Sequence, residues 1–166
     1  MTGVILIGMP GVGKTFIGRN LAKALSYDYI DIDDEMISFK NKSLIEIIKD
    51  IGEKGFLVLE EKTILNLKDL DKKIISTGGS AVYSKKAMNF LKEKGKIIMM
   101  DASLEIIKKR LDNQQTRGII GIKNKKIEQL YEERQKLYKK YSDIIVNTDD
   151  FNLERIIKEI TVLIKK

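Results

Sequence analysis

Short apolar runs alternate with amphipathic segments along the chain. The runs have the length of strands, and they cover residues 4–7, 29–34, 73–76, 96–101 and 143–148. The segments with apolar residues at helical spacing cover residues 16–25, 35–70, 84–94, 104–111, 127–141 and 153–164. Within residues 35–70 we expect breaks near Asn41 and Gly52, and residues 43–46 have the pattern of a capping box. Strands that alternate with helices predict an α/β fold, in which a parallel sheet is covered by helices on both faces.

A glycine-rich loop connects the first strand to the first helix. Residues 8–15 fit the pattern G-x-x-x-x-G-K-[ST] at every fixed position. The strand–loop–helix context distinguishes a phosphate-binding loop from a chance match. In such a loop Lys14 reaches the β- and γ-phosphates, the Thr15 hydroxyl is placed to bind Mg²⁺, and backbone N–H groups point at the anion. The residues expected to hold ATP here are Gly11, Val12, Gly13, Lys14, Thr15 and Phe16.

Acidic residues close the second apolar run, at the edge of the sheet where ligands are expected. Strand alternation would put the side chains of Asp31 and Asp33 on one side. One can support Mg²⁺, and the other can receive or orient an acceptor hydroxyl. The competing interpretation is that these acids cap a helix beginning near Glu35, and Asp34 fits that role.

A second glycine turn follows the third strand. Residues 77–80 read Thr-Gly-Gly-Ser, and the backbone can approach a ligand closely at Gly78 and Gly79 because neither residue has a side chain. A plain turn is the competing interpretation. Because the turn directly follows a strand, a ligand site and a plain turn are equally good interpretations of these residues.

A polar segment interrupts the helical pattern at residues 112–124. It contains Arg117, Gly118 and Gly121 and lies between two helices, which predicts a mobile lid. The chain has 26 lysines and five arginines, so an arginine can mark a place that needs a planar, bidentate donor. Those from residue 110 to residue 134 are Arg110, Arg117 and Arg134.

Length and composition narrow the possible functions. At 166 residues we expect one domain. The chain has no cysteine and no histidine, so a general base must be a carboxylate, a lysine or a tyrosine. The net charge is +7, but the lysines are mixed with acids, so we expect no nucleic-acid partner. A strand begins at the N-terminus and no apolar run approaches the roughly 20 residues of a membrane span, so we expect a cytoplasmic protein without a signal peptide.

These motifs, in this order over essentially the whole chain, resemble the shikimate kinase family. The resemblance implies a P-loop three-layer sandwich with a five-stranded parallel sheet, of the nucleoside-monophosphate-kinase type. It also implies an ATP-dependent phosphotransferase whose acceptor is an alcohol group of a small metabolite. Helices over about residues 33–62 would bind the acceptor, and a lid over about residues 112–124 would close the site. We expect a monomer.

The resemblance also implies roles for single residues. The first aspartate of the D-x-D motif, Asp31, would serve the metal together with Thr15, and the second, Asp33, would contact the acceptor hydroxyls. Residues 77–82 resemble the family's G-G-G-A-V turn, which places Gly78 and Gly79 beside the acceptor.

The resemblance also implies roles for three arginines. Arg110 and Arg117 match two nucleotide-side arginines of the family. Arg134 lies in a match to E-R-x-x-L-Y, whose arginine clamps the substrate carboxylate. Residues 52–56 and Glu60 resemble the substrate-domain helix. The residues expected to act in catalysis are Lys14, Asp33 and Arg117.

The acceptor half departs from the family pattern. Leu57 occupies the position of a second carboxylate-binding arginine, Ser80 replaces the third glycine of the turn, and residues 117–120 replace the lid motif R-P-L-L. We therefore expect ATP to bind as in the family, and Leu57 to contact an acceptor that is shikimate or a related polyol or hydroxy acid. We expect shikimate itself to be a poor substrate. The alternatives are another small-molecule or nucleotide kinase of this fold and a non-catalytic ATP-binding module.

Overall fold

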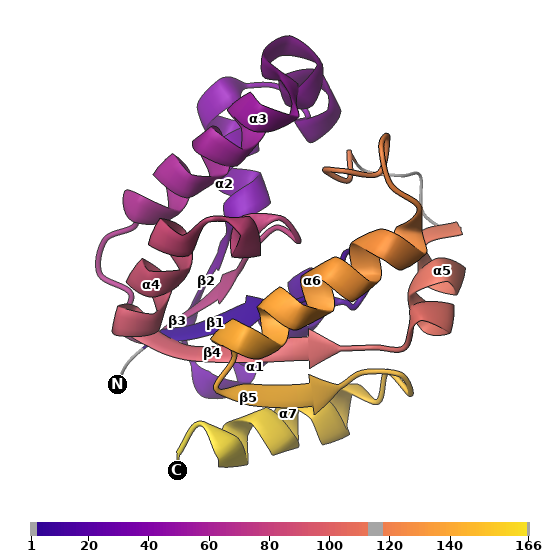
Figure 1. Ribbon diagram of the computed structural model, residues 1–166. Coiled ribbons are helices and arrows are strands. Elements are labelled where there is room, and N and C mark those ends of the chain that lie inside the picture. Colours follow the sequence, from indigo (N-terminus) through magenta and orange to yellow (C-terminus); the bar gives the residue numbers. More distant parts are fainter. Residues whose placement is uncertain (1–2, 113–117, 166) are drawn as a thin grey trace.

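The structure, a computed structural model, describes residues 3–112 and 118–165 (Figure 1). A sheet of five parallel strands lies at its centre, in the order β2-β3-β1-β4-β5. The strands are β1 (Gly3–Ile7), β2 (Asp28–Asp31), β3 (Lys73–Ser76), β4 (Gly95–Asp101) and β5 (Ile144–Asn147). The predicted α/β class and five-stranded parallel sheet are confirmed.

Helices α1 and α7 pack together on one face of the sheet, and α4 and α6 cover the other face (Figure 1). Helices α2 and α3 extend beyond the end of β2, above the carboxyl edge of the sheet (Figure 1). The helices are α1 (Lys14–Leu25), α2 (Ile32–Lys40), α3 (Leu44–Leu65), α4 (Lys85–Lys94), α5 (Leu104–Asp112), α6 (Ile127–Tyr141) and α7 (Leu153–Leu163), with a short 3₁₀ helix η1 (Ala81–Tyr83) after β3.

The central strand β1 is buried at every position. Its register places Leu6 between Ser76 of β3 and Ile98 of β4. Ile17 and Leu21 of α1 are fully buried in the same core. A continuous apolar run is what a parallel strand needs when helices cover both of its faces. This packing fixes the start of the glycine-rich loop that follows β1.

The breaks expected near Asn41 and Gly52 are confirmed. Asn41 ends α2 in the left-handed conformation, with φ of 51°. Helix α3 begins with a capping box in which the Ser43 hydroxyl accepts from the Glu46 amide and Glu46 bonds back to the Ser43 amide. Gly52 interrupts α3 with φ of 70°. The resulting kink changes the direction of the helix, whose neighbours are α2, α4 and η1.

The second strand is shorter than the sequence predicts. It ends at Asp31, and α2 begins at Ile32. The Asp31 side chain accepts a 3.1 Å hydrogen bond from the amide of Asp33 and so caps α2. Asp33 therefore lies in the first turn of a helix, and the argument from strand alternation was wrong. Within residues 3–112 and 118–165, no helix is long and apolar enough to cross a membrane.

Candidate active site

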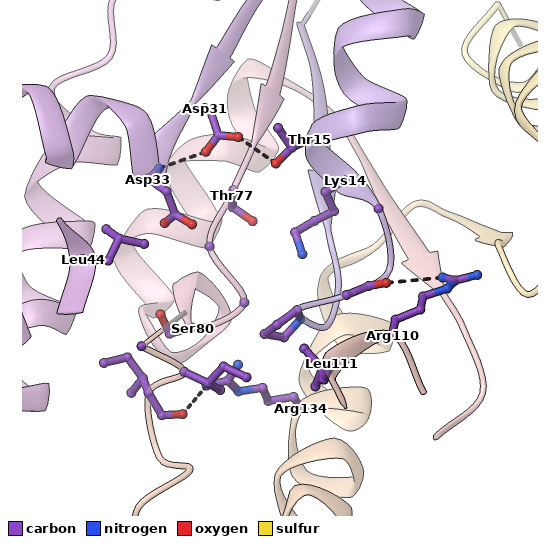
Figure 2. A pocket seen from close by; sticks show the side chains of 18 of the residues that line it. Lys14, Thr15, Asp31, Asp33, Leu44, Thr77, Ser80, Arg110, Leu111 and Arg134 are labelled. Carbon is purple, nitrogen blue, oxygen red and sulfur yellow. Dashed lines mark hydrogen bonds between the residues drawn. The ribbon is translucent and has the colours of Figure 1, made fainter. Parts of the chain in front are cut away.

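A cavity of about 460 Å³ lies at the carboxyl ends of β1, β2 and β3 (Figure 2). This is the edge of an open α/β sheet where ligands bind. It is bordered by the glycine-rich loop, the start of α2, the turn after β3 and the buried side of α6. The predicted site residues that line it are Gly11, Gly13, Lys14, Thr15, Phe16, Asp31, Asp33, Gly78, Gly79, Arg110 and Arg134.

The loop has the backbone that anion binding requires. Gly13 precedes α1 with φ of 95°, a conformation that favours glycine, and a Cβ atom there would come within 2.4 Å of the Phe151 ring. Lys14 begins the helix, so its amide and those after it lie at the positive end of the helix dipole. The Nζ atom of Lys14 donates hydrogen bonds of 2.7 and 2.9 Å to the carbonyl oxygens of Gly8 and Met9.

The charge of Lys14 is held in a buried position. Burial lowers the pKa of its ammonium group to about 8, and the carboxylates of Asp33 and Asp31 oppose this shift. Figure 2 shows the Lys14 side chain reaching into the cavity, across from Asp33. A desolvated cation in this position gains strongly from an anionic ligand, which agrees with a phosphate-binding role.

Thr15 and Asp31 form a pair at the end of β2. The Thr15 hydroxyl donates a 3.0 Å hydrogen bond to Oδ2 of Asp31, and the Tyr29 hydroxyl donates a 2.9 Å bond to the same oxygen. No cluster of three or more acidic side chains suited to a metal ion occurs among the described residues. One hydroxyl and one carboxylate still fit Mg²⁺, because this ion is usually held by few protein ligands and completes its shell with phosphate oxygens and water.

The acceptor side of the cavity is closed by a buried arginine. Arg134 of α6 is 1% exposed. Its Nη2 atom donates a 2.7 Å hydrogen bond to the carbonyl of Ile120, and its Nε atom donates a 3.3 Å bond to the Tyr83 hydroxyl. A Cβ atom on Gly79 would be 2.8 Å from Nη1, so the glycine turn and the guanidinium lie against each other. The Tyr138 hydroxyl donates a 2.7 Å bond to the Gly79 carbonyl and fixes this turn.

Aromatic and basic groups gather on the opposite, nucleotide side. Arg110 donates hydrogen bonds to the carbonyls of Gly11 and Thr148, at 3.3 and 2.7 Å, and lies over the Phe151 ring. Phe151 stacks on Phe16 with ring centroids 5.7 Å apart. Partial burial lowers the pKa of Arg110. Flat, partly exposed rings beside a guanidinium form a surface on which a nucleotide base can stack.

Not every predicted site residue reaches the cavity. The Val12 side chain is buried in the core, so Val12 can contribute only its backbone. Leu57 packs against the core and lines a second cavity, of about 130 Å³, because it is rotated by roughly 100° around α3 from Phe56, which faces the main cavity. The structure thus places Leu57 away from the predicted acceptor contact. Arg117 lies outside the described residues.

The described part of the predicted lid covers the cavity. Gly118, Ile119 and Ile120 line it, and a Cβ atom on Gly118 would be 2.7 Å from the Ile48 side chain of α3. The Gly121 amide donates a 3.0 Å hydrogen bond to the Glu53 carboxylate, also on α3. This segment therefore bridges α3 and α6 in the structure.

Some residues of the site had no role in the prediction. Phe151 and Leu111 line the nucleotide side, and Leu44 lines the acceptor side. Ser80 also lines the cavity and bonds to Glu60, a buried acid on α3. Glu60 was named only in the family resemblance, without a role. The sequence carried a further signal for it, because an acid occupies a position four residues after Phe56 and four before Ile64, on a face that is otherwise apolar.

Known proteins of the same kind match this chain over nearly all of its length. The family model for shikimate kinase matches residues 10–165. The chain belongs to the shikimate kinase family. A shikimate kinase from Sulfurihydrogenibium is 32% identical over 166 residues, which is 100% of this chain and 99% of that protein. One from Clostridium botulinum is 38% identical over 152 residues, which is 90% of this chain and 89% of the relative.

Solved structures agree. The shikimate kinase from Acinetobacter baumannii, solved in complex with shikimate, superposes with a TM-score of 0.88 at 25% identity, over 99% of this chain and 93% of that one. The chain is therefore an ATP-dependent phosphotransferase with an alcohol group as acceptor. Its acceptor is a small molecule. The family resemblance drawn from the sequence motifs is confirmed.

Proposed function

We propose that this protein transfers the γ-phosphoryl group of ATP to a hydroxyl of shikimate, or of a closely related polyol carboxylate. The observation that carries this proposal is the arrangement of three groups around one cavity. Lys14 lies at the phosphate loop, Asp33 lies across from it, and Arg134 lies at the end of the cavity opposite Thr15 and Asp31 (Figure 2). Such a cavity can hold a triphosphate, a hydroxyl and a carboxylate in line.

Asp33 is the group that we assign to the acceptor hydroxyl. The chain has no histidine, and Asp33 is the carboxylate of α2 that lines the cavity beside Gly78. In the reaction the hydroxyl loses its proton to Asp33 and its oxygen forms a bond to the γ-phosphorus. The bond from that phosphorus to the β–γ bridging oxygen breaks, and ADP leaves. Lys14 and the loop amides stabilise the charge that develops on the phosphate oxygens.

Arg134 is the group that we assign to the acceptor carboxylate. Its guanidinium is buried and is held by Ile120 and Tyr83, so it is already oriented before the acceptor binds. Leu57 offers no second guanidinium. A carboxylate held by one arginine loses a charge-assisted contact that is typically worth ~1.5–3 kcal/mol. We therefore expect shikimate to be phosphorylated with a high KM.

Thr15 and Asp31 would hold Mg²⁺ when it is bound with ATP. The ion supplies charge neutralisation on the β- and γ-phosphates. Asp31 is buried and its two oxygens are oriented by Thr15, Tyr29 and the Asp33 amide. Oriented ligands of this kind are expected of a metal site, since hydrogen bonds to the ligand fix its direction.

The remaining predictions concern the whole chain. We assign acceptor binding to α2 and the first part of α3, within residues 33–62, and site closure to residues 112–124, all within one domain. Gly118 and Gly121 provide the flexibility that such a lid needs. A monomeric state, a location in the cytoplasm and the absence of a nucleic-acid partner stay predictions from the sequence.

A panel of acceptors with Mg²⁺–ATP tests the proposal. Formation of ADP would be followed by a coupled assay with shikimate, quinate, gluconate and nucleoside monophosphates. We expect ADP to form with shikimate and to depend on its concentration. Turnover of nucleoside monophosphates alone, or ATP binding without acceptor-dependent ADP formation, would contradict it.

A further inference from the structure

A buried carboxyl group beside the acceptor side has no role in the mechanism above. Glu60 of α3 is 1% exposed. Its Oε2 atom accepts a 2.6 Å hydrogen bond from the Ser80 hydroxyl. Its Oε1 atom is also buried and has no hydrogen-bond partner within residues 3–112 and 118–165. An oxygen of this kind is costly to leave unpaired, so its presence indicates a partner that arrives with a ligand.

The unpaired oxygen lies against the glycine turn that lines the site. A Cβ atom on Gly78 would lie 2.3 Å from Oε1 of Glu60 and 3.1 Å from Oδ1 of Asp33. The carboxyl groups of Glu60 and Asp33 therefore flank one glycine of the turn. Gly78, Asp33 and Ser80 all line the main cavity, and Ser80 also lines the smaller cavity behind it together with Glu60.

The electrostatic surroundings tie Glu60 to the same site. Burial raises the pKa of Glu60 to about 7. The Ser80 hydrogen bond lowers the pKa, Asp33 raises it, and Arg134 and Lys14 lower it. Near neutral pH the carboxyl group is thus present with and without its proton. A hydroxyl can pair with both forms because it donates and accepts, whereas a carboxylate suits only the protonated form and an ammonium group only the ionised form.

We propose that Oε1 of Glu60 hydrogen-bonds a hydroxyl of the acceptor next to the hydroxyl that Asp33 holds. Ser80 is a positioning residue that keeps Oε1 directed at Gly78 by holding Oε2. Asp33 and Glu60 then bind two neighbouring hydroxyls of a polyol, one each. This inference rests on the proposed function, since it takes a polyol as the acceptor.

The test pairs changes in Glu60 with changes in the acceptor. Glu60→Met keeps the size of the side chain and removes its hydrogen bonds, and Glu60→Gln is the conservative variant. The matched control is Glu61→Met, because Glu61 lies next along α3 and bonds to Ser84 at 2.6 Å. KM and kcat would be measured with shikimate and with analogues that each lack one ring hydroxyl, and thermal unfolding would report on folding.

We expect Glu60→Met to raise the KM for shikimate by about tenfold or more while the KM for ATP stays within about twofold. For the analogue that lacks the hydroxyl bound by Glu60, the effect of Glu60→Met should disappear. Glu60→Gln should recover part of the loss, and Glu61→Met should have no effect. An equal rise in KM for every analogue, or none for shikimate, would overturn the proposal.

Two further measurements keep the test decisive. If Glu60→Met does not fold, Ser80→Ala takes its place, and it should raise the KM for shikimate with the same dependence on one hydroxyl. The proposed function is judged separately, by turnover of shikimate in the unaltered protein. If that protein phosphorylates quinate or gluconate instead, shikimate is not the acceptor, and Glu60 is judged on that polyol and its deoxy derivatives. If it phosphorylates only nucleoside monophosphates or no acceptor, the proposed function fails.

Discussion

The ammonium group of Lys14 donates a 2.7 Å hydrogen bond to the carbonyl oxygen of Gly8, the first residue of its own loop. The loop therefore holds the lysine over the space that the phosphates of ATP are proposed to fill. When a nucleotide binds, this cation can exchange a neutral carbonyl for phosphate oxygens. Its contribution to turnover should then be far larger than its contribution to folding.

The first prediction follows directly. Lys14→Met should lower kcat by about 100-fold or more, because stabilisation of developing charge by one such group is usually worth that much. The melting temperature should stay the same or rise, since an apolar side chain replaces a buried cation. A coupled kinase assay and a thermal melt measure the two quantities. Activity within about tenfold of the unaltered protein would refute the role of Lys14.

Nucleotide binding should also take up protons in mildly alkaline solution. Burial lowers the pKa of Lys14 to about 8, so at pH 8.5 much of the group is neutral in the free protein. Bound phosphates favour the charged form and raise this pKa, which requires a proton from the solvent. Calorimetric titration with a non-hydrolysable ATP analogue, in two buffers of different ionisation enthalpy, measures the uptake. Proton uptake should be absent in Lys14→Met, and it should decrease when the solution is well below pH 8, because Lys14 is then already charged. Equal binding heats in both buffers at pH 8.5 would contradict this prediction.

Asp33→Asn should separate acceptor chemistry from nucleotide binding. We expect phosphorylation to fall by about 100-fold or more, with ATP affinity changed by less than about threefold, because Asp33 acts on the hydroxyl. The matched control is Asp34→Asn, since Asp34 is exposed and pairs with Arg19 at 3.2 Å. If Asp33→Asn weakened both functions equally, Asp33 would belong to the metal site and the base would need another residue.

Leu57→Arg should improve shikimate as a substrate. Leu57 itself lines the smaller cavity, but Ser80 borders both cavities, so the longer side chain of an arginine can extend past Ser80 and supply a second charge-assisted contact to the acceptor carboxylate. We expect kcat/KM to rise by about tenfold. Val58→Arg is the control, because Val58 is 53% exposed and lies next along the helix. Equal effects of the two substitutions would mean that general positive charge, and not a specific contact, is responsible.

The sequence predicted those parts of the site that depend on neighbouring residues. The loop that carries Lys14 and Thr15, the capping box at Ser43 and the break at Gly52 each follow from local chemistry. Asp33 was placed in the right cavity by the wrong argument. The Asp31 side chain caps α2, so the strand ends at Asp31 and the alternation of side chains along a strand does not apply to Asp33.

The parts that the sequence could not predict depend on contacts between distant segments. Ser80 and Glu60 are 20 positions apart, and their hydrogen bond exists because α3 packs beside the turn after β3. Leu57 was expected to contact the acceptor, but the rotation of α3 around its axis decides which side chains face the cavity. Phe151 reaches Phe16 across a similar tertiary contact. The spacing of apolar residues identifies the buried face of a helix, but it does not identify the segment against which that face packs.

Direct observation of the phosphorylated product tests the central claim. Shikimate, ATP and Mg²⁺ would be incubated with the protein and followed by ³¹P nuclear magnetic resonance, with Lys14→Met and Asp33→Asn as controls. The account predicts a new phosphate-ester signal that grows in step with ADP and is absent in both variants. The growth of inorganic phosphate alone, or of no signal except ATP, would contradict it.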